Sequence, residues 1–315
     1  MSYSKVKTNS LKAWILAARP KTLSGAAVPV MIGISMAYAD CSDDNPFSWF
    51  PAILCFLFAF IMQIDSNFIN DYFDCIKGND DVETRLGPKR ACSEGWITLP
   101  KMRMGLIITS LLGCLTGLPL VIYGGWAMII VGALCVLFAF LYTTKLSYLG
   151  LGDILVLVFF GIVPVYFTYW VIVPQEMQVF NLRLLFAGIA CGVVIDTLLI
   201  INNYRDRDND KRDGKNTLVV RIGTTASELL YQNLGFTGAI IILCTTLCKS
   251  IYTNTFIDYA IAILLTSIYI FFHITTYRTM KKIKQGRELN KVLGLTARNM
   301  FFFGITSVIT ILLFW

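Results

Sequence analysis

The chain has 315 residues, of which 56% are hydrophobic and 15% charged, and its mean hydropathy is +0.65. This composition excludes an ordinary soluble domain, because roughly a quarter of the residues in such domains are charged. The net charge of +7 is carried by an otherwise apolar chain. It therefore indicates basic loops beside a membrane surface rather than a nucleic-acid-binding face.

Nine apolar runs are long enough to cross about 30 Å of hydrocarbon as helices. We exclude a cleavable signal peptide, because no small-residue cleavage site follows the first run before the next polar turn. The prediction is an all-α fold: one domain over residues 1–315, a polytopic membrane bundle of nine transmembrane helices. The predicted spans are 22–39, 47–70, 105–123, 126–143, 153–174, 182–204, 229–248, 255–277 and 299–315.

The basic residues predict the orientation of the bundle. If the N-terminus is cytoplasmic, all of the 27 Lys and Arg residues except Arg183 and Lys249 fall in cytoplasmic segments. This asymmetry is typical of the positive-inside rule. We therefore expect a multi-pass protein of the inner (cytoplasmic) membrane with its C-terminus outside.

Cysteine and histidine offer no metal-binding pattern. The nine cysteines include no CxxC pair, and most fall within predicted spans, so we interpret them as small core residues. The single histidine, His273, lies in the eighth span. One histidine cannot build a histidine-based zinc site.

Two predicted spans end in acidic clusters. The second ends in NDYFDCIKGND (70–80) and the sixth in NNYRDRDNDKRDGKNT (202–217). Both spans run from the outside to the cytoplasm, with three spans between them. We therefore predict a weak internal repeat, helices 1–4 and 5–8 followed by a ninth, that brings both clusters to one face of the membrane.

The clusters combine carboxylate and amide side chains at helical spacing. Acids at a helix C-terminus are destabilised by the helix dipole, so a positive partner is expected. Nearby lysines would leave the paired Asn–Asp pattern unexplained. Oxygen ligands without His or Cys favour Mg²⁺, which readily shares phosphate oxygens. The residues that share a helix face are Asn67, Asn70, Asp71 and Asp74 in one cluster, and Asn202, Asn203, Asp206 and Asp210 in the other.

Two Mg²⁺ ions between the clusters would suit a diphosphate. Flanking cations can hold its remaining oxygens. No GxxxxGK[ST] loop is present, which argues against a nucleotide triphosphatase. The candidate diphosphate-binding residues are Lys77, Arg85, Lys145, Arg205 and Lys215.

At these motifs the chain resembles the UbiA superfamily of intramembrane aromatic prenyltransferases. The family's first acidic motif is similar to Asn70, Asp71, Asp74 and Asp80, and its second to Asp206 and Asp210. The resemblance implies that Asn70, Asp74, Asp206 and Asp210 hold Mg²⁺ on a prenyl diphosphate, with Asp71 and Asp80 assisting. Asp71, Asp74, Asp206 and Asp210 are therefore the expected catalytic residues.

Finer features resemble the branch of this family that prenylates 1,4-dihydroxy-2-naphthoate to demethylmenaquinone. The resemblance implies an allylic cation that the naphthoate ring attacks, with loss of CO₂, and polyprenyl diphosphate, aromatic acceptor and lipid bilayer as partners. The sequence does not define an oligomeric state. The segments that carry this resemblance are AARPKTL (17–23), QIDSNFINDYFD (63–74), RLGPKRACSEGWIT (85–98), YLGLGD (148–153), NNYRDRDNDKRDGKNTLVVRIG (202–223) and GRELNKVLGLTAR (286–298).

Further residues are expected to bind the substrates. Tyr142 and Tyr148 would lie at the cytoplasmic mouth, where ring faces stabilise cations. Arg19 and Lys21 would hold the acceptor carboxylate or the diphosphate, or simply anchor the helix at the inner leaflet. The expected substrate-binding residues are Arg19, Lys21, Asn67, Tyr142, Tyr148, Asn203 and Asp196.

Two acids lie deeper in the membrane. Asp65 and Asp196 are about 9 and 15 Å along their helices from Asp71 and Asp206, at 1.5 Å per residue. Buried acids in a membrane are costly and usually functional. Two roles are open for them: they accept a ring proton, or they pair with each other. Asp65 departs from the family pattern, which has an apolar residue there.

Two alternatives remain at this point. A sister prenyltransferase would act on 4-hydroxybenzoate or homogentisate. A transporter would also carry intramembrane acids, but its acids are expected near the midplane on broken helices. Here they cluster at one face of the membrane beside basic loops.

Overall fold

The structure, a computed structural model, describes residues 6–78, 85–248 and 255–315, so the predicted assisting residue Asp80 lies outside it. Within these ranges all regular structure is helical and no strand occurs. The elements are α1 (Leu11–Ala18), η1 (Pro20–Thr22), α2 (Leu23–Asp40), α3 (Trp49–Lys77), α4 (Leu99–Gly117), α5 (Leu120–Gly124), α6 (Ala127–Leu141), η2 (Tyr142–Leu146), α7 (Gly152–Val156), η3 (Leu157–Ile162), α8 (Val163–Ile172), η4 (Gln175–Met177), α9 (Leu182–Arg212), α10 (Leu218–Leu247), α11 (Phe256–Ile283) and α12 (Leu289–Phe314).

The helices confirm the predicted membrane bundle. In the described part of the chain, eight helical segments are long and apolar enough to cross a membrane. The apolar helix α6 has only 15 residues, but the π-helix η2 continues it directly. Each of the nine predicted apolar runs therefore corresponds to one helical stretch.

Several helices extend beyond the predicted spans. α3 continues from residue 70 to Lys77 and α9 from residue 204 to Arg212, so both carry their acids on regular helix. The short helix α1 was not predicted. A hydropathy pattern ends at the membrane boundary, whereas the backbone hydrogen bonds of a helix continue into polar sequence.

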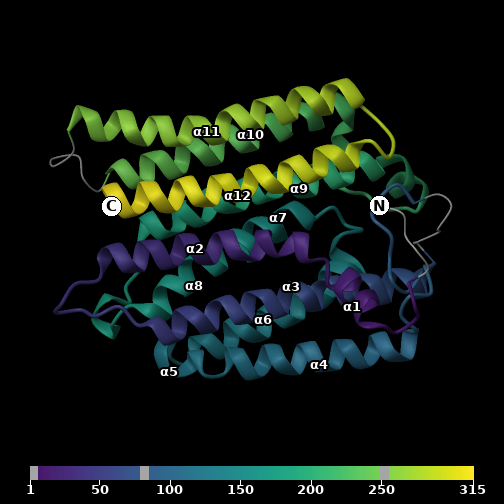
Figure 1. Cartoon of the computed structure of the whole chain (residues 1–315), viewed down its shortest axis with the longest axis horizontal. Coiled ribbons are helices and arrows are strands. Elements are labelled where there is room, and N and C mark those ends of the chain that lie inside the picture. The colour runs from purple at the N-terminus through teal and green to yellow at the C-terminus, as the bar shows by residue number, and fades with distance from the viewer. Residues whose placement is uncertain (1–5, 79–84, 249–254) are drawn as a thin grey trace.

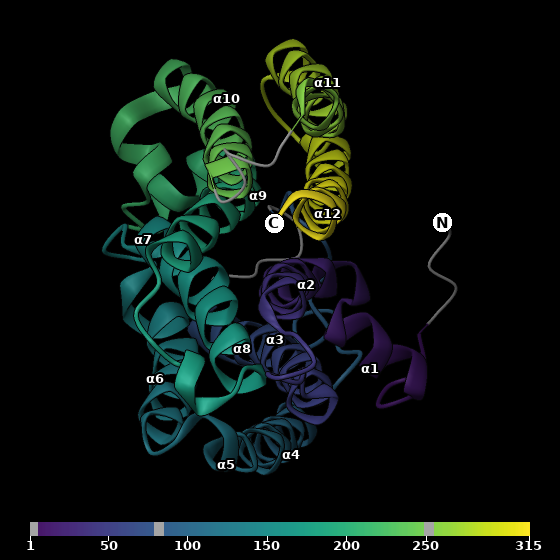
Figure 2. The same cartoon turned by 90° about the vertical axis from the view of Figure 1, so that its left-hand side faces the viewer.

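The helices lie side by side along the long axis of the molecule (Figure 1). α9 packs against α10 and η3, α2 packs against α8 and α12, and α3 packs against α4. The view along the helices shows α9–α12 grouped on one side and α4–α6 on the other, with α2, α3 and α8 between them (Figure 2). Since α3 packs against α4, the acidic ends of α3 and α9 belong to different sides of the bundle.

The end of the bundle opposite the acidic clusters is held by side chains. Asp40 of α2 accepts hydrogen bonds from the Tyr169 hydroxyl of α8 at 2.9 Å and from the C-terminal Trp315 indole at 2.8 Å. The Arg183 guanidinium of α9 lies 4.8 Å from the centre of the Trp315 ring. These contacts join α2, α8, α9 and the end of α12. The acidic clusters lie at the other end of the bundle.

Candidate active site

A cavity of about 2030 Å³ lies between the two sides of the bundle. The polar ends of α3 and α9 both line it. Apolar side chains continue the lining along α3, α6 and η3, among them Phe58, Val131 and Phe159. The cavity thus combines a polar mouth with a long apolar interior.

At the end of α3, the following loop folds back onto the acids. Asp71 is fully buried, and it accepts hydrogen bonds from the backbone amides of Ala91 and Cys92, each at 2.9 Å. Arg19 approaches the same carboxylate at 4.0 Å. Asp74 lies one turn further along and forms an ion pair of 3.1 Å with Arg90. Asp71 therefore anchors the 85–97 loop, whereas Asp74 faces the cavity.

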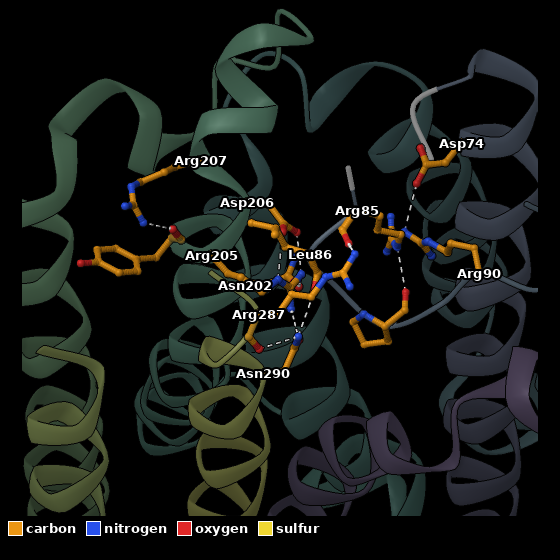
Figure 3. Close-up of polar contacts among 12 residues, drawn as sticks. Asp74, Arg85, Leu86, Arg90, Asn202, Arg205, Asp206, Arg207, Arg287 and Asn290 are labelled. Atoms are coloured by element: carbon orange, nitrogen blue, oxygen red, sulfur yellow. Dashed lines mark hydrogen bonds and ion pairs between the residues drawn. The ribbon is translucent and has the colours of Figure 1, made fainter. Parts of the chain in front are cut away.

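At the end of α9, Arg205 is the centre of a polar network. The residue is 2% exposed, and its guanidinium donates to Asp206 at 2.8 Å, to Asn202 at 2.8 Å and to Asn290 of α12 at 2.8 Å. Asn290 in turn donates to the Leu86 carbonyl at 2.8 Å. Figure 3 shows Asp206 within this network and Asp74 on the far side of the view, next to Arg90.

The 85–90 loop touches both acidic helix ends. Arg90 binds Asp74, and the Leu86 carbonyl binds Asn290, the partner of Arg205. The backbone at Gly87 lies so close to Arg205 that a Cβ atom there would be 2.7 Å from its Nη2 atom. The loop therefore connects the two clusters, and a side chain at position 87 would disturb the connection.

A second connection crosses the mouth through Tyr148. Lys77 from the end of α3 lies 4.5 Å from the centre of the Tyr148 ring, and Lys215 from the segment after α9 lies 5.6 Å from it. Two cations against one aromatic ring fix the separation of the helix ends at this point.

The structure brings most of the predicted site residues to one cavity. Lys145 is exposed on η2 and does not line it. Asp71, Lys77, Arg205 and Asp196 also lie outside the lining, although each packs near it. The predicted residues on the cavity wall are Arg19, Lys21, Asn67, Asn70, Asp74, Arg85, Tyr142, Tyr148, Asn203, Asp206, Asp210 and Lys215.

Asn67 has a specific positioning role. Its amide donates to the Ala18 carbonyl and to the Thr22 hydroxyl, each at 3.0 Å. Between those residues the backbone of Arg19 adopts a left-handed conformation, with φ of 51°. Asn67 therefore holds the break between α1 and α2 that presents Arg19 to the cavity.

The two deeper acids do not pair with each other. Asp65 accepts hydrogen bonds from the hydroxyls of Thr109 and Ser110 on α4. The acidic neighbour of Asp196 is instead Asp153, at the start of α7. The predicted alternative of an Asp65–Asp196 pair is therefore wrong, because each helix faces a different neighbour.

Sequence reasoning missed Arg90, Asn290 and Asp153. All three belong to segments that resemble the family, but the contacts of Arg90 and Asn290 depend on how loops return across the mouth. Asp153 stands alone after the turn at Gly150 and Gly152, without a second acid at helical spacing. A charged residue at the start of an apolar run was the available signal.

The donor set is suited to Mg²⁺. Within the described ranges, no three His, Cys, Asp or Glu side chains gather into a closed metal cage. Mg²⁺ does not need one, because it is usually held by one or two carboxylates together with water and substrate phosphate. Asn70, Asp74, Asp206 and Asp210 offer such oxygens on the wall of one cavity. These residues therefore fit an ion shared with a diphosphate.

Comparison with known proteins identifies the family. The profile of the UbiA prenyltransferase family matches residues 26–312. The chain belongs to the UbiA prenyltransferase family. This UbiA protein is 38% identical over 221 residues to the 1,4-dihydroxy-2-naphthoate octaprenyltransferase of Escherichia coli (strain K12), covering 67% of this chain and 69% of the relative. The enzyme of the same name from Haemophilus influenzae is 33% identical over 264 residues, covering 81% and 83% of the two chains.

Solved structures agree on the fold. A UbiA homolog from Archaeoglobus fulgidus bound to GPP and Mg²⁺ superposes with a TM-score of 0.60 over 94% of this chain and 99% of that chain, at 13% sequence identity. The predicted resemblance and the prenyltransferase class of this UbiA protein are thus confirmed. The transporter alternative gains no support.

Proposed function

We propose that this UbiA protein transfers a polyprenyl group from polyprenyl diphosphate to 1,4-dihydroxy-2-naphthoate, with release of diphosphate and CO₂, to give demethylmenaquinol, the reduced form of demethylmenaquinone. The observation that carries the proposal is a single cavity. Two acidic helix ends line its mouth, and apolar side chains line its long interior. Two relatives named for this reaction support the choice of acceptor.

We assign the diphosphate to the polar mouth. The homolog bound to GPP, a prenyl diphosphate, and Mg²⁺ supports this assignment and the use of that metal. Asn70, Asp74, Asp206 and Asp210 would hold the metal, which supplies positive charge to the departing diphosphate when bound. Arg85 and Lys215 line the same mouth and would hold the remaining phosphate oxygens.

The apolar interior suits the prenyl chain and the allylic cation. A cation that forms here must be kept from water, which would otherwise capture it. Phe159 and Tyr142 line the cavity, and their ring faces can stabilise positive charge. We expect these walls to exclude water until the acceptor ring attacks.

The mouth is expected to face the cytoplasm. The connections that surround it carry nearly all Lys and Arg residues of the chain, as the positive-inside rule requires for the cytoplasmic side. Both substrates would then enter from that side. The diphosphate group of the prenyl donor would come from the aqueous phase and its prenyl chain from the bilayer.

The test is an acceptor panel. Purified protein in lipid nanodiscs is incubated with Mg²⁺, a polyprenyl diphosphate and, separately, 1,4-dihydroxy-2-naphthoate, 4-hydroxybenzoate or homogentisate, and products are identified by mass spectrometry. We expect a prenylated product that has lost the carboxylate from the naphthoate alone, and none after chelation of Mg²⁺. Transfer only to another acceptor would contradict the proposed substrate.

A further inference from the structure

Two carboxyl groups that the proposed diphosphate site does not use lie on neighbouring helices beside the cavity. Asp153, the second residue of α7, lines the cavity. Asp196 of α9 is 6% exposed and has Asp153 as its acidic neighbour. α7 packs against α9, and the two helices lie next to each other in Figure 2. The pair therefore bridges the cavity wall and the helix behind it.

One oxygen atom of each carboxyl group is left without a hydrogen-bond partner among the described residues. The Oδ1 atoms of Asp153 and Asp196 are both buried and have no hydrogen-bond partner in the described part of the chain. A buried acceptor without a partner costs about 1–3 kcal/mol, and two adjacent carboxylates in a low-dielectric site also repel each other. Structural needs alone do not account for such a pair.

An aromatic hydroxyl is already placed at this point of the wall. A Cβ atom at Gly152 would lie 3.8 Å from the Tyr142 hydroxyl oxygen and 3.5 Å from its Cε2 atom. The absence of a side chain at Gly152 therefore lets the Tyr142 ring approach the start of α7. Tyr142 begins the π-helix η2, and such helices occur frequently at functional sites.

We propose that Asp153 and Asp196 share one proton and that Asp153 binds a ring hydroxyl of the aromatic acceptor. Two neighbouring carboxyl groups that are removed from water cannot both ionise readily, so the pair keeps one proton and one acceptor site. Asp153 touches the cavity and acts on the substrate. Asp196 does not line the cavity, so it is a positioning residue that maintains the shared proton.

The chemistry rests on the proposed function and balances without any other reactant. A bond forms between the ring carbon that bears the carboxylate and C1 of the prenyl group, as the C1–oxygen bond to diphosphate breaks and the diphosphate leaves with that electron pair. Asp153 takes the proton of the neighbouring hydroxyl, and the O–H electron pair forms a ring ketone.

The second half of the reaction returns the proton. The ring carbon now carries both the prenyl group and the carboxylate, next to the ketone. The bond to the carboxylate breaks, CO₂ leaves, and the released electron pair restores the aromatic ring. Asp153 then gives its proton back to the ring oxygen. A pair that takes up one proton and then returns it is sufficient for the whole sequence.

The test compares Asp153→Asn, Asp153→Glu and Asp196→Asn with wild type, and uses Asp65→Asn as a matched control for loss of a buried acid. Binding of a non-hydrolysable prenyl thiolodiphosphate with Mg²⁺ is measured by calorimetry, and kcat and KM are measured for 1,4-dihydroxy-2-naphthoate. We expect Asp153→Asn to bind the analogue as wild type does, to raise KM for the naphthoate, and to lower kcat about 100-fold. Asp153→Glu should restore part of kcat.

Asp196→Asn separates positioning from structure through a pH profile. Tyr142 of η2 interacts electrostatically with both acids of the pair and, toward the mouth, with Asp74 and Asp210, whereas η3 (LVFFGI) contributes no titratable group. With Asn at position 196 the partner of Asp153 stays neutral at every pH, so the alkaline limb of kcat/KM that loss of the shared proton causes in wild type should disappear. A purely structural role would leave this limb in place.

The possible results are distinct. Asp153→Asn with kcat and KM for the naphthoate within threefold of wild type would overturn the proposal, as would an unchanged alkaline limb in Asp196→Asn. Wild-type protein that fails to prenylate the naphthoate would overturn the proposed function first, and this inference with it.

Discussion

Asp65 and Asp196 are single acids within the second and sixth membrane helices, yet their surroundings differ. Asp65 is fully buried and accepts hydrogen bonds from two hydroxyls of α4, the Ser110 bond measuring 3.1 Å. Asp196 has a buried oxygen without a partner and an acidic neighbour, Asp153. An acid inside the membrane therefore indicates chemistry only when the protein leaves it unsatisfied.

The same difference recurs at the mouth of the cavity. Asp71 accepts hydrogen bonds from two backbone amides. These amides are fixed in the chain and cannot turn away as a side chain can. Asp74 and Asp206 instead face Arg90 and Arg205, which are side chains and can move when another cation arrives. An acid held by backbone amides therefore has a structural role. An acid held by a side chain can exchange that partner for a metal ion.

The largest effect is expected from Asp206→Asn. The substitution keeps the size of the side chain but removes the charge, so we expect kcat/KM for prenyl transfer to fall about 10²- to 10³-fold. Asp208→Asn, an exposed acid on the same helix, is the matched control and should retain activity. Asp206→Asn with activity within threefold of wild type would remove this acid from the reaction.

Asp71→Ala should reduce stability more than any change to Asp65. Two buried backbone amides would lose their acceptor and Arg19 its nearby charge, which we expect to cost about 3 kcal/mol of unfolding free energy. Denaturation in detergent micelles measures this loss. An unchanged denaturation midpoint would show that the 85–97 loop has another anchor.

Gly87→Ala tests the connection between the two acidic clusters. The new Cβ atom would lie 2.7 Å from Nη2 of Arg205, so either the loop or the guanidinium must shift. We expect KM for the prenyl diphosphate to rise about tenfold, which corresponds to 1.4 kcal/mol. A KM for the prenyl diphosphate within twofold of wild type would contradict this role of the loop.

Asp65→Ala should have the smallest effect. The Thr109 hydroxyl also reaches the Gly105 carbonyl of its own helix at 3.0 Å, so it keeps a partner after the substitution. We expect a loss of about 1 kcal/mol in stability and wild-type kcat for prenyl transfer. A large fall in kcat at unchanged stability would make Asp65 a functional acid and end its contrast with Asp196.

Much of the fold follows from hydropathy, because each membrane crossing requires a long apolar run. The acids at the ends of α3 and α9 are also predictable, since helical spacing alone places them on one face. The roles of Arg90 and Asn290 cannot be predicted from the sequence. They depend on how the 85–90 loop and the start of α12 fold back across the mouth. The role of Asp153 is not predictable for a similar reason, because its acidic neighbour, Asp196, is on another helix.

The central claim is that the ends of α3 and α9 act together on one Mg²⁺-bound diphosphate. The most direct measurement is calorimetric binding of a prenyl thiolodiphosphate, with and without Mg²⁺, to wild type, Asp74→Asn, Asp210→Asn and the double variant. The account predicts that Mg²⁺ strengthens binding in wild type, that each single variant loses most of this gain, and that the double variant loses little more. If one cluster carries the whole gain and the other none, the two helix ends do not share a ligand and the account is wrong.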